Sequence, residues 1–253
     1  MTQFALKLIA LLSMLLDHTA KVLPVTELLS TWLGIETAML VRDTMLVLGR
    51  MAFPMFAWFA AEGCRKTADI RKYVLRLLVF AVLSEVPFQL CFYGRSFAAL
   101  VPACHNVIFT ILLAALAVWG GQVLAARRVP VLAAYLLPAL AAIAVGWFLH
   151  TDYNAWGVAL ILGLYYMRDR KGQFLWMAAW ITVFQLVWHG WNGSTLSWLS
   201  ASGSIQLLYW LGALIGEAVL MTYNGERGPG AKWLFYVFYP THLLLLFFLR
   251  TAI

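Results

Sequence analysis

The sequence has little charge. Only 11% of its 253 residues are Asp, Glu, Lys or Arg, whereas 63% are hydrophobic, and the mean hydropathy is +0.83. A soluble domain could not bury that much apolar surface, so the composition predicts an integral membrane protein.

Several common catalytic and metal-binding motifs are also absent. The sequence contains no HExxH, GxSxG or Walker motif, so a zinc protease, an α/β-hydrolase and a P-loop NTPase lack support. Its three cysteines, Cys64, Cys91 and Cys104, have no CxxC spacing and predict no metal site. Cys91 and Cys104 bracket one short loop, which leaves two interpretations open: a disulfide, or two ordinary buried thiols.

The net charge of +7 does not indicate nucleic-acid binding, because no dense basic run occurs. Most Lys and Arg residues lie in short gaps between apolar segments, which is the pattern that orients membrane helices. We therefore expect membrane lipids, and no nucleic acid, as partners.

Apolar segments recur along the whole chain. Crossing a hydrocarbon core takes about 20 helical residues, and we count about nine such segments. They cover approximately residues 4–23, 45–64, 73–90, 107–125, 131–149, 155–167, 174–188, 205–222 and 233–249. Asp17 and His18 interrupt the first segment where a signal peptide would be apolar, so we expect it to be retained. With no linker or repeat, residues 1–253 are predicted to form one all-α domain, a transmembrane helix bundle.

Basic residues alternate between the predicted loops. Every second loop is basic. Apart from residues 24–44, which include Arg42, the intervening loops carry Arg95 alone or no basic residue. The basic loops hold Arg65, Lys66, Arg71 and Lys72, then Arg127 and Arg128, then Arg168, Arg170 and Lys171, then Arg227 and Lys232. The positive-inside rule places these loops and the N-terminus in the cytoplasm, and the C-terminus outside. Residues 24–44 would then lie on the outer side, where their mixed character suits an interfacial helix.

Polar side chains of five chain segments are predicted to reach one level in the outer half of the bundle. They are Asp17 with His18, Arg50, Glu85, His105 with Asn106, and Asp152 with Tyr153 and Asn154. A charge in lipid costs several kcal/mol, so each such group is paired inside the bundle or lines a path. This layer is the main functional signal in the sequence.

Each of these residues also has a simpler interpretation. Asp17 and Lys21 have the i, i+4 spacing of a helix ion pair, and Arg50 could extend to the interface. Glu85 precedes Pro87 near a helix end, where it could contact freed backbone groups. His18 is different, because successive helix positions point about 100° apart and Asp17 cannot readily orient it. We expect its partner to come from another helix.

Two features of the last helices complete the pattern. His242 lies about nine residues, or roughly 14 Å, into the final segment, which places it near the midplane. It is expected either to hydrogen-bond inside the bundle, with Glu217 as a candidate partner, or to line a route through the protein. Gly212 and Gly216 form a GxxxG motif, which predicts close helix packing.

Five short motifs together resemble the TraX family, in the same order and over nearly the whole chain. They are Leu-Leu-Asp-His-Thr-Ala-Lys (15–21), Leu-Gly-Arg-Met-Ala-Phe-Pro-Met-Phe-Ala (48–57), Asn-Val-Ile-Phe (106–109), Asp-Tyr-Asn-Ala-Trp-Gly-Val (152–158) and Phe-Tyr-Pro-Thr-His-Leu (238–243). The chain is also distantly similar to larger transmembrane acyltransferases.

The resemblance implies an acetyltransferase of the bacterial inner membrane that uses acetyl-CoA as its donor. The family's namesake, from F-type conjugative plasmids, acetylates the N-terminus of the pilin subunit, whereas the larger acyltransferases also modify sugars. A pilin or a glycan is therefore the expected acceptor. The site positions that the resemblance carries over are Asp17, His18, Arg50, Asn106, Asp152, Tyr153 and His242.

An amine or hydroxyl that attacks a thioester needs a base and an oxyanion donor. We expect His18 to be the base, oriented by Asp152 or another carboxylate, with Arg50, Asn106 or Tyr153 supplying positive potential and hydrogen bonds. Transfer through an acetyl-histidine is a variant. A basic cluster would attract the phosphates of the donor. The same charges can also be explained as a signal that sets the membrane topology. The cluster consists of Arg65, Lys66, Arg71, Lys72 and Arg76.

Two other classes of function fit the same residues. Intramembrane acids, histidines and a helix broken near Pro54 also suit a transporter or channel, although no inverted repeat supports it. The third class is a non-catalytic assembly protein for a surface filament.

Overall fold

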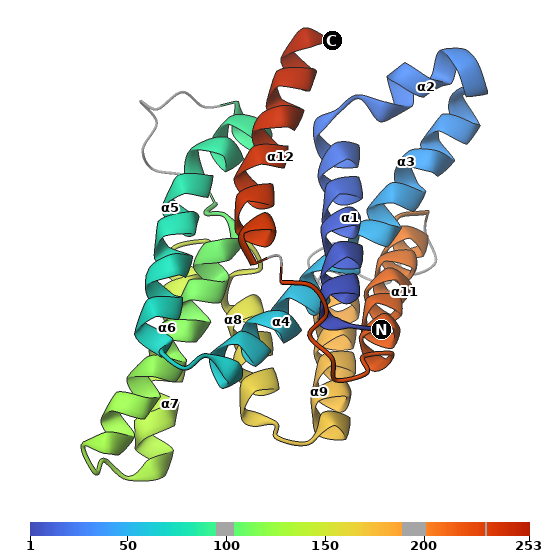
Figure 1. The fold of residues 1–253 in the computed structure, drawn as a ribbon. Helices are drawn as coiled ribbons and strands as arrows, with labels where there is room; N and C mark the ends of the chain where they lie inside the picture. Colours follow the sequence, from blue (N-terminus) through green and yellow to red (C-terminus); the bar gives the residue numbers. More distant parts are fainter. Residues whose placement is uncertain (95–103, 189–200, 231) are drawn as a thin grey trace. The chain divides into compact units, whose positions relative to one another are not determined.

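The computed structural model describes residues 1–94, 104–188, 201–230 and 232–253, and these fold into helices without a β-strand (Figure 1). The predicted all-α class is confirmed. The helices are α1 (Gln3–Val22), α2 (Val25–Leu33), α3 (Ile35–Gly49), α4 (Ala52–Lys66), α5 (Ile70–Tyr93), α6 (Val107–Ala126), α7 (Val131–Phe148), α8 (Asn154–Tyr166), α9 (Arg170–Thr182), α11 (Ala201–Met221) and α12 (Lys232–Ala252). A π-helical turn, η1 (Val183–Trp188), follows α9.

Within the described ranges, five helical stretches are long and apolar enough to cross a membrane. A sixth candidate span arises if α1 and α2, which meet at an 87° bend, are counted as one span. Two shorter apolar helices cover Asn154–Tyr166 and Ile205–Met221. The chain is therefore a helical protein with several candidate membrane spans. The count of nine and the cytoplasmic N-terminus stay predictions. Arg95, in one predicted outer loop, and residues 191–200, in the predicted outer loop between segments 174–188 and 205–222, lie outside the described residues.

One predicted boundary was wrong. Residues 45–64 were expected as a complete span, but the structure has a 32-residue apolar stretch, Ile35–Lys66, with a break between α3 and α4. Glu36, Arg42 and Asp43 lower the hydropathy of the N-terminal part of α3. Hydropathy alone therefore assigned this part of the helix to a loop. In the structure these residues are helical, and α3 packs against both α1 and α2.

The described residues group into two compact units. Unit 1 comprises Met1–Phe56 and Met177–Ile253, and unit 2 comprises Ala57–Trp176. The chain passes between the two units inside α4 and again inside α9. The single domain predicted for residues 1–253 stays a prediction.

In unit 1, glycines allow close helix contacts. A Cβ atom on Gly212 would collide with the carbonyl of Val47, and one on Gly216 would lie 2.8 Å from the Cα of Met51. The close helix packing predicted for the GxxxG motif of α11 is confirmed, and the structure shows that the contact is with the end of α3 and with Met51. Another contact in unit 1 joins α1 to α12: Phe4 meets Phe235 edge-on, with ring centroids 6.1 Å apart.

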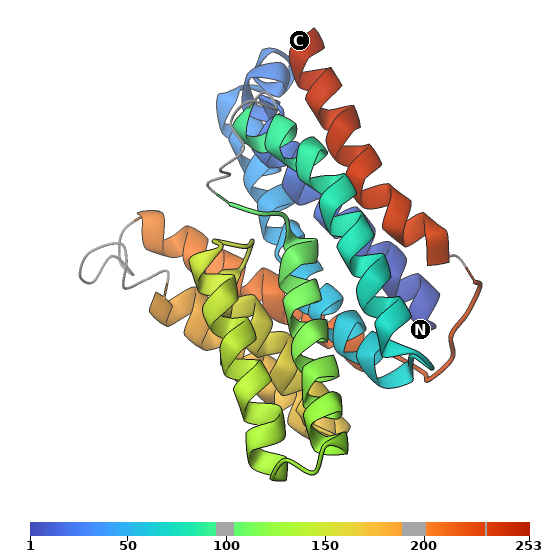
Figure 2. The ribbon, with the colours of Figure 1, turned by 90° about the vertical axis from the view of Figure 1, so that its left-hand side faces the viewer.

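In unit 2, α6 is the central helix and contacts α5, α7 and α8; Figure 2 shows it between α5 and α7. Its Gly121 leaves room for the ring of Tyr135 on α7. The outer face of α7 is apolar and exposed, with Leu132 and Phe148 each 77% exposed. Such a face suits lipid, which does not penalise apolar side chains.

The glycine contacts predict a difference between two matched substitutions. Gly212→Ala should lower the free energy of unfolding by about 1–3 kcal/mol, because the added methyl group collides with Val47 and overpacks the helix contact. Gly230→Ala should have almost no effect, since nothing lies within 4 Å of the added atom. Thermal unfolding in detergent measures both, and equal melting temperatures would contradict the packing described for α11.

Candidate functional site

Unit 1 contains a buried carboxylate near the end of α1. Asp17, only 7% exposed, accepts from the Lys21 ammonium at 2.6 Å through Oδ2 and pairs with the Arg50 guanidinium through Oδ1. The predicted i, i+4 ion pair is confirmed. Arg50, whose side chain is 16% exposed, turns inward to the carboxylate instead of extending to the interface.

The end of α3 brings Arg50 to this position. A Cβ atom on Gly49 would lie 2.5 Å from the Asp17 Cβ, so only glycine lets the two helices approach this closely. Arg50 then follows directly as the C-cap of α3. Its guanidinium carbon lies 5.0 Å from the centre of the Tyr209 ring of α11, a cation–π contact.

Two histidines form a second feature of unit 1. The Nδ1 atom of His18 lies 2.7 Å from Nε2 of His242, and Nδ1 of His242 lies 2.8 Å from the carbonyl oxygen of Phe238. His242 is 4% exposed. The partner of His18 thus comes from another helix, α12, as predicted. The expected contact of His242 with Glu217 was wrong, because both ring nitrogens of His242 face other atoms.

These contacts fix the tautomers of the neutral rings. A carbonyl oxygen only accepts, so Nδ1 of His242 must carry the hydrogen and donate it to Phe238. The Nε2 atom of His242 then accepts from Nδ1–H of His18. A neutral His18 therefore carries its lone pair on Nε2, which is the atom that can act as a base.

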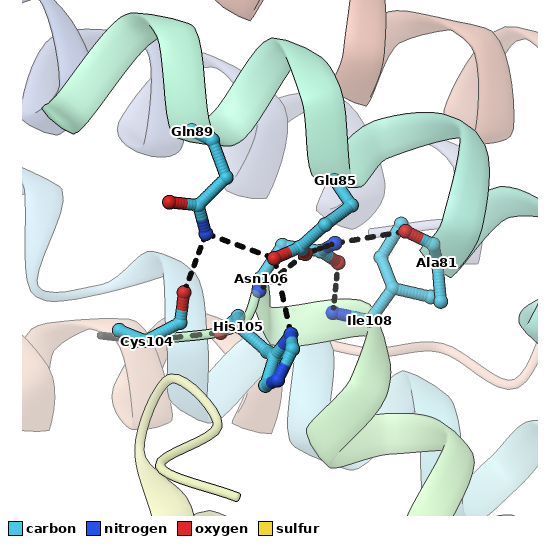
Figure 3. Close-up of polar contacts among 7 residues, drawn as sticks. All are labelled: Ala81, Glu85, Gln89, Cys104, His105, Asn106 and Ile108. Carbon is cyan, nitrogen blue, oxygen red and sulfur yellow. Dashed lines mark hydrogen bonds and ion pairs between the residues drawn. The ribbon is translucent and has the colours of Figure 1, made fainter. Parts of the chain in front are cut away.

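A carboxylate also organises unit 2 (Figure 3). Oε1 of Glu85 accepts from Gln89 at 2.8 Å and lies 3.0 Å from Nδ1 of His105. Its Oε2 accepts from the side-chain amide of Asn106 at 2.6 Å and from the Asn106 backbone N–H at 3.2 Å. Glu85 therefore holds the start of α6, a larger role than the backbone contact expected from the sequence.

Asn106 is engaged in the same network. It is fully buried, its amide donates to the carbonyl of Ala81 at 2.9 Å, and its Oδ1 accepts from the N–H of Ile108 as the N-cap of α6. Its oxygen and amide groups thus support the fold of unit 2. Its role as an oxyanion donor stays a prediction.

A pocket of about 370 Å³ lies beside this network. The loop before α8 supplies most of its lining, which comprises Cys104, Trp147, His150, Thr151, Asp152, Tyr153 and Asn154. The backbone N–H of Asp152 donates to the carbonyl of His105 at 2.8 Å, and the Thr110 hydroxyl donates to the carbonyl of Asp152. Sequence reasoning missed His150; the only available signal was its place two residues before Asp152.

The loop that lines this pocket has unusual backbone angles. His150, Tyr153 and Asn154 have φ values of 50°, 60° and 33°, in the left-handed region that side chains other than glycine seldom adopt. Conformations of this kind cost free energy and occur often at functional sites. The surrounding hydrogen bonds hold the loop in this shape.

The predicted polar layer therefore forms two clusters. Unit 1 brings together Asp17, His18, Arg50 and His242, and unit 2 brings together Glu85, His105, Asn106 and the loop of Asp152 and Tyr153. Within unit 1, the partner of His18 is a histidine. Orientation of His18 by Asp152 and a single layer across the chain stay predictions.

The predicted donor-binding residues differ in their surroundings. Arg65 pairs with Glu62 and donates to the carbonyl of Leu164 at 2.6 Å, and Lys66 lies 2.6 Å from the Glu62 carboxylate. The Arg76 guanidinium lies 5.8 Å from the Tyr73 ring. Arg71 and Lys72 are exposed at the start of α5.

These features define the class of the protein: it is a helical membrane protein with a buried ion cluster and a histidine pair. The family model described as TraX protein matches residues 3–250, and the chain belongs to the TraX family. It is also 27% identical to the probable fimbrial assembly protein FimC, serogroup H1, of Dichelobacter nodosus, over 96% of this chain and 93% of that protein. No solved structure matches the chain.

The ion cluster predicts non-additive mutational effects. Arg50→Met should lower the free energy of unfolding by about 3–5 kcal/mol, because it removes the inner partner of a buried carboxylate. Asp17→Asn in the same chain should restore most of that loss. Lys21→Met is the matched control and should cost at most about 1 kcal/mol, since the Lys21 side chain is 41% exposed. Additive losses in a double-mutant cycle would rule out the proposed coupling.

Cys104 gives a test of the pocket's electrostatics. No disulfide joins it to Cys91. Burial, with the negative charges of Asp152 and Glu85, raises the pKa of the Cys104 thiol to about 12. In a Cys64→Ala, Cys91→Ala background, its alkylation rate should keep rising from about pH 7 to about pH 10, because only the thiolate reacts. A plateau near pH 9 would show an ordinary thiol instead.

Proposed function

We propose that this protein is an acetyltransferase of the inner membrane, which moves an acetyl group from cytosolic acetyl-CoA to an acceptor on the outer side. Membership in the TraX family supports a pilus-related role, as does the fimbrial assembly name of its Dichelobacter relative. The N-terminus of a pilin subunit is therefore the acceptor that we favour, with a cell-surface sugar as the second candidate.

The His18–His242 contact is the observation that carries this proposal. Acyl transfer to an amine or hydroxyl needs a positioned base. The hydrogen-bond chain from His18 through His242 to Phe238 leaves the lone pair of neutral His18 on Nε2. His18 is then the catalytic base, and His242 is a positioning residue that acts through it.

The ion cluster next to His18 supplies the electrostatic part of the mechanism. Arg50 and Lys21 carry two positive charges against the single negative charge of Asp17, which leaves one positive charge in excess. A positive potential inside a low-dielectric bundle favours the oxyanion that forms when a thioester carbonyl is attacked. Asp17 and Arg50 would thus contribute by field and position, without proton transfer.

The proposed reaction is a direct transfer. The acceptor nitrogen or oxygen forms a bond to the acetyl carbonyl carbon while its proton moves to Nε2 of His18. The carbon–sulfur bond then breaks, and the departing CoA thiolate takes up that proton. The products are an acetylated acceptor, free CoA and neutral His18. In the variant with an acetyl-histidine, His18 itself would be labelled before the acceptor arrives.

The surroundings of the basic residues favour a smaller donor site than the sequence suggested. Arg65 and Lys66 share the carboxylate of Glu62, which cancels one of their two positive charges and holds both side chains away from a phosphate. Arg71 and Lys72 are exposed at the start of α5. The Lys72 ammonium lies 3.9 Å from the Asp69 carboxylate, an exposed pair that solvent weakens, so both residues can attract the phosphates of acetyl-CoA. We propose that these two residues attract the donor.

The histidine pair predicts a graded series of activities in acetyl transfer by purified protein. His18→Ala should lower kcat by about 10²- to 10⁴-fold, the usual contribution of a general base. His242→Gln should keep more activity than His242→Phe, because only the amide oxygen can accept from Nδ1–H of His18. Thr241→Val is the control on α12; its hydroxyl donates to the helix carbonyl of Val237, and its activity should match the wild type.

Mass spectrometry of cells with and without the gene tests the function itself. Loss of an acetyl group from the pilin N-terminus in the deletion strain is the expected result. Loss of acetyl groups from surface glycans alone would show that the acceptor is a sugar instead of the pilin. Unchanged acetylation of both would contradict the proposed enzyme, and substrate uptake by liposomes without an acyl donor would indicate a transporter.

A further inference from the structure

The pocket in unit 2 has an acidic lining. Asp152 lines it, and no Lys or Arg does so among the residues that the structure describes. Glu85 adds a second carboxylate behind His105, 3.0 Å from its Nδ1 atom. Burial is the main cause of the raised pKa of Cys104, and the charges of both carboxylates raise it further, in agreement with this negative potential. Such a pocket disfavours the phosphates of acetyl-CoA and favours a cation.

One buried polar group in this pocket has no partner. Thr151 is 2% exposed, and its hydroxyl makes no hydrogen bond in the described part of the chain. Buried hydroxyl groups are bonded in the great majority of cases, because an unmade bond costs free energy. An unpartnered hydroxyl in the wall of a pocket therefore points to a ligand that completes it.

The remaining lining offers hydrogen-bond acceptors and an aromatic face. Nδ1 of His150 lies 3.2 Å from the carbonyl of Phe148, so it donates there and the lone pair of the neutral ring lies on Nε2. The Trp147 side chain is 45% exposed beside it, and an indole face attracts cations. The left-handed angles of His150, Tyr153 and Asn154 hold this lining in place.

We propose that this pocket is a recognition subsite that binds the ammonium group of the acceptor before transfer; the ammonium group must then lose one proton to water, and the neutral amine is the form that attacks the thioester. An ammonium group has three donors and no acceptor, which matches the Asp152 carboxylate, the Thr151 hydroxyl oxygen and the His150 lone pair. The proposal rests on the proposed acetyl transfer for its biological meaning, because a protein N-terminus presents an ammonium group. Its binding test requires no transfer.

The test compares two short synthetic peptides of one sequence, with a free and with an acetylated N-terminus, by their Kd for the detergent-purified protein without acetyl-CoA. The free peptide should bind at least about tenfold tighter, the usual effect of a charged hydrogen bond. Asp152→Asn should abolish this preference. Glu27→Gln, which removes an exposed carboxylate of α2, should leave it unchanged and so controls for net charge.

A second variant separates a lost contact from a lost fold. Thr151→Val has nearly the same shape, and the Thr151 hydroxyl makes no bond in the structure, so the variant should unfold at the wild-type temperature. It should weaken binding of the free peptide several-fold. Equal affinity for both peptides, or wild-type preference in Asp152→Asn, would overturn the subsite. Acetylation of a neutral sugar with no peptide preference would overturn the subsite and leave the transferase standing.

Discussion

The ion pair between Asp17 and Arg50 is the constraint on which the arrangement of unit 1 depends. A charge inside a bilayer must be paired or reach water, and Asp17 is buried near the end of α1. Arg50 reaches it because α3 ends in Gly49, whose missing side chain permits the approach. The pair therefore fixes how α1 is rotated about its own axis.

That rotation determines where the next residue points. His18 follows Asp17 and lies about 100° further around the helix, so a carboxylate held toward α3 leaves the imidazole facing α12. There it meets His242, whose other nitrogen contacts the Phe238 carbonyl. The Asp17–Arg50 ion pair and the step of about 100° between helix positions thus place His18. The carbonyl of Phe238 sets its tautomer through His242. In unit 2, Glu85 has a comparable role, since it joins the start of α6 to α5 beside the strained pocket loop.

Sequence reasoning predicted those features that follow from local spacing. The bounds of α1, α6 and α7, the Asp17–Lys21 pair, the GxxxG contact and an interhelical partner for His18 all depend on helix geometry or on hydropathy. The identity of that partner depends on the rotation of α12 relative to α1, which the residue spacing within either helix does not encode. For the same reason Glu217 was the wrong choice for His242. The extension of α3 was missed because its acidic and basic residues lower the hydropathy of a helix that tertiary packing supports.

His150 and Thr151 were missed for a different reason. Nothing in the spacing of residues 148–154 predicts left-handed backbone angles at three side-chain-bearing positions, and these angles give the loop its pocket. Such conformations depend on long-range hydrogen bonds, here between the loop and His105. Function at this loop was expected from the predicted polar layer, through Asp152, Tyr153 and Asn154, and from the TraX motif at residues 152–158, and neither set contains His150 or Thr151.

Nitrogen NMR of the purified protein with isotope-labelled histidine tests the tautomer chain most directly. Single substitutions of His18 and His242 assign the two signals. At a pH where both rings are neutral, the account predicts that the hydrogen lies on Nδ1 in each ring, with a shared hydrogen bond between His18 Nδ1 and His242 Nε2. A hydrogen on Nε2 of His242, or two rings that do not interact, would contradict the account.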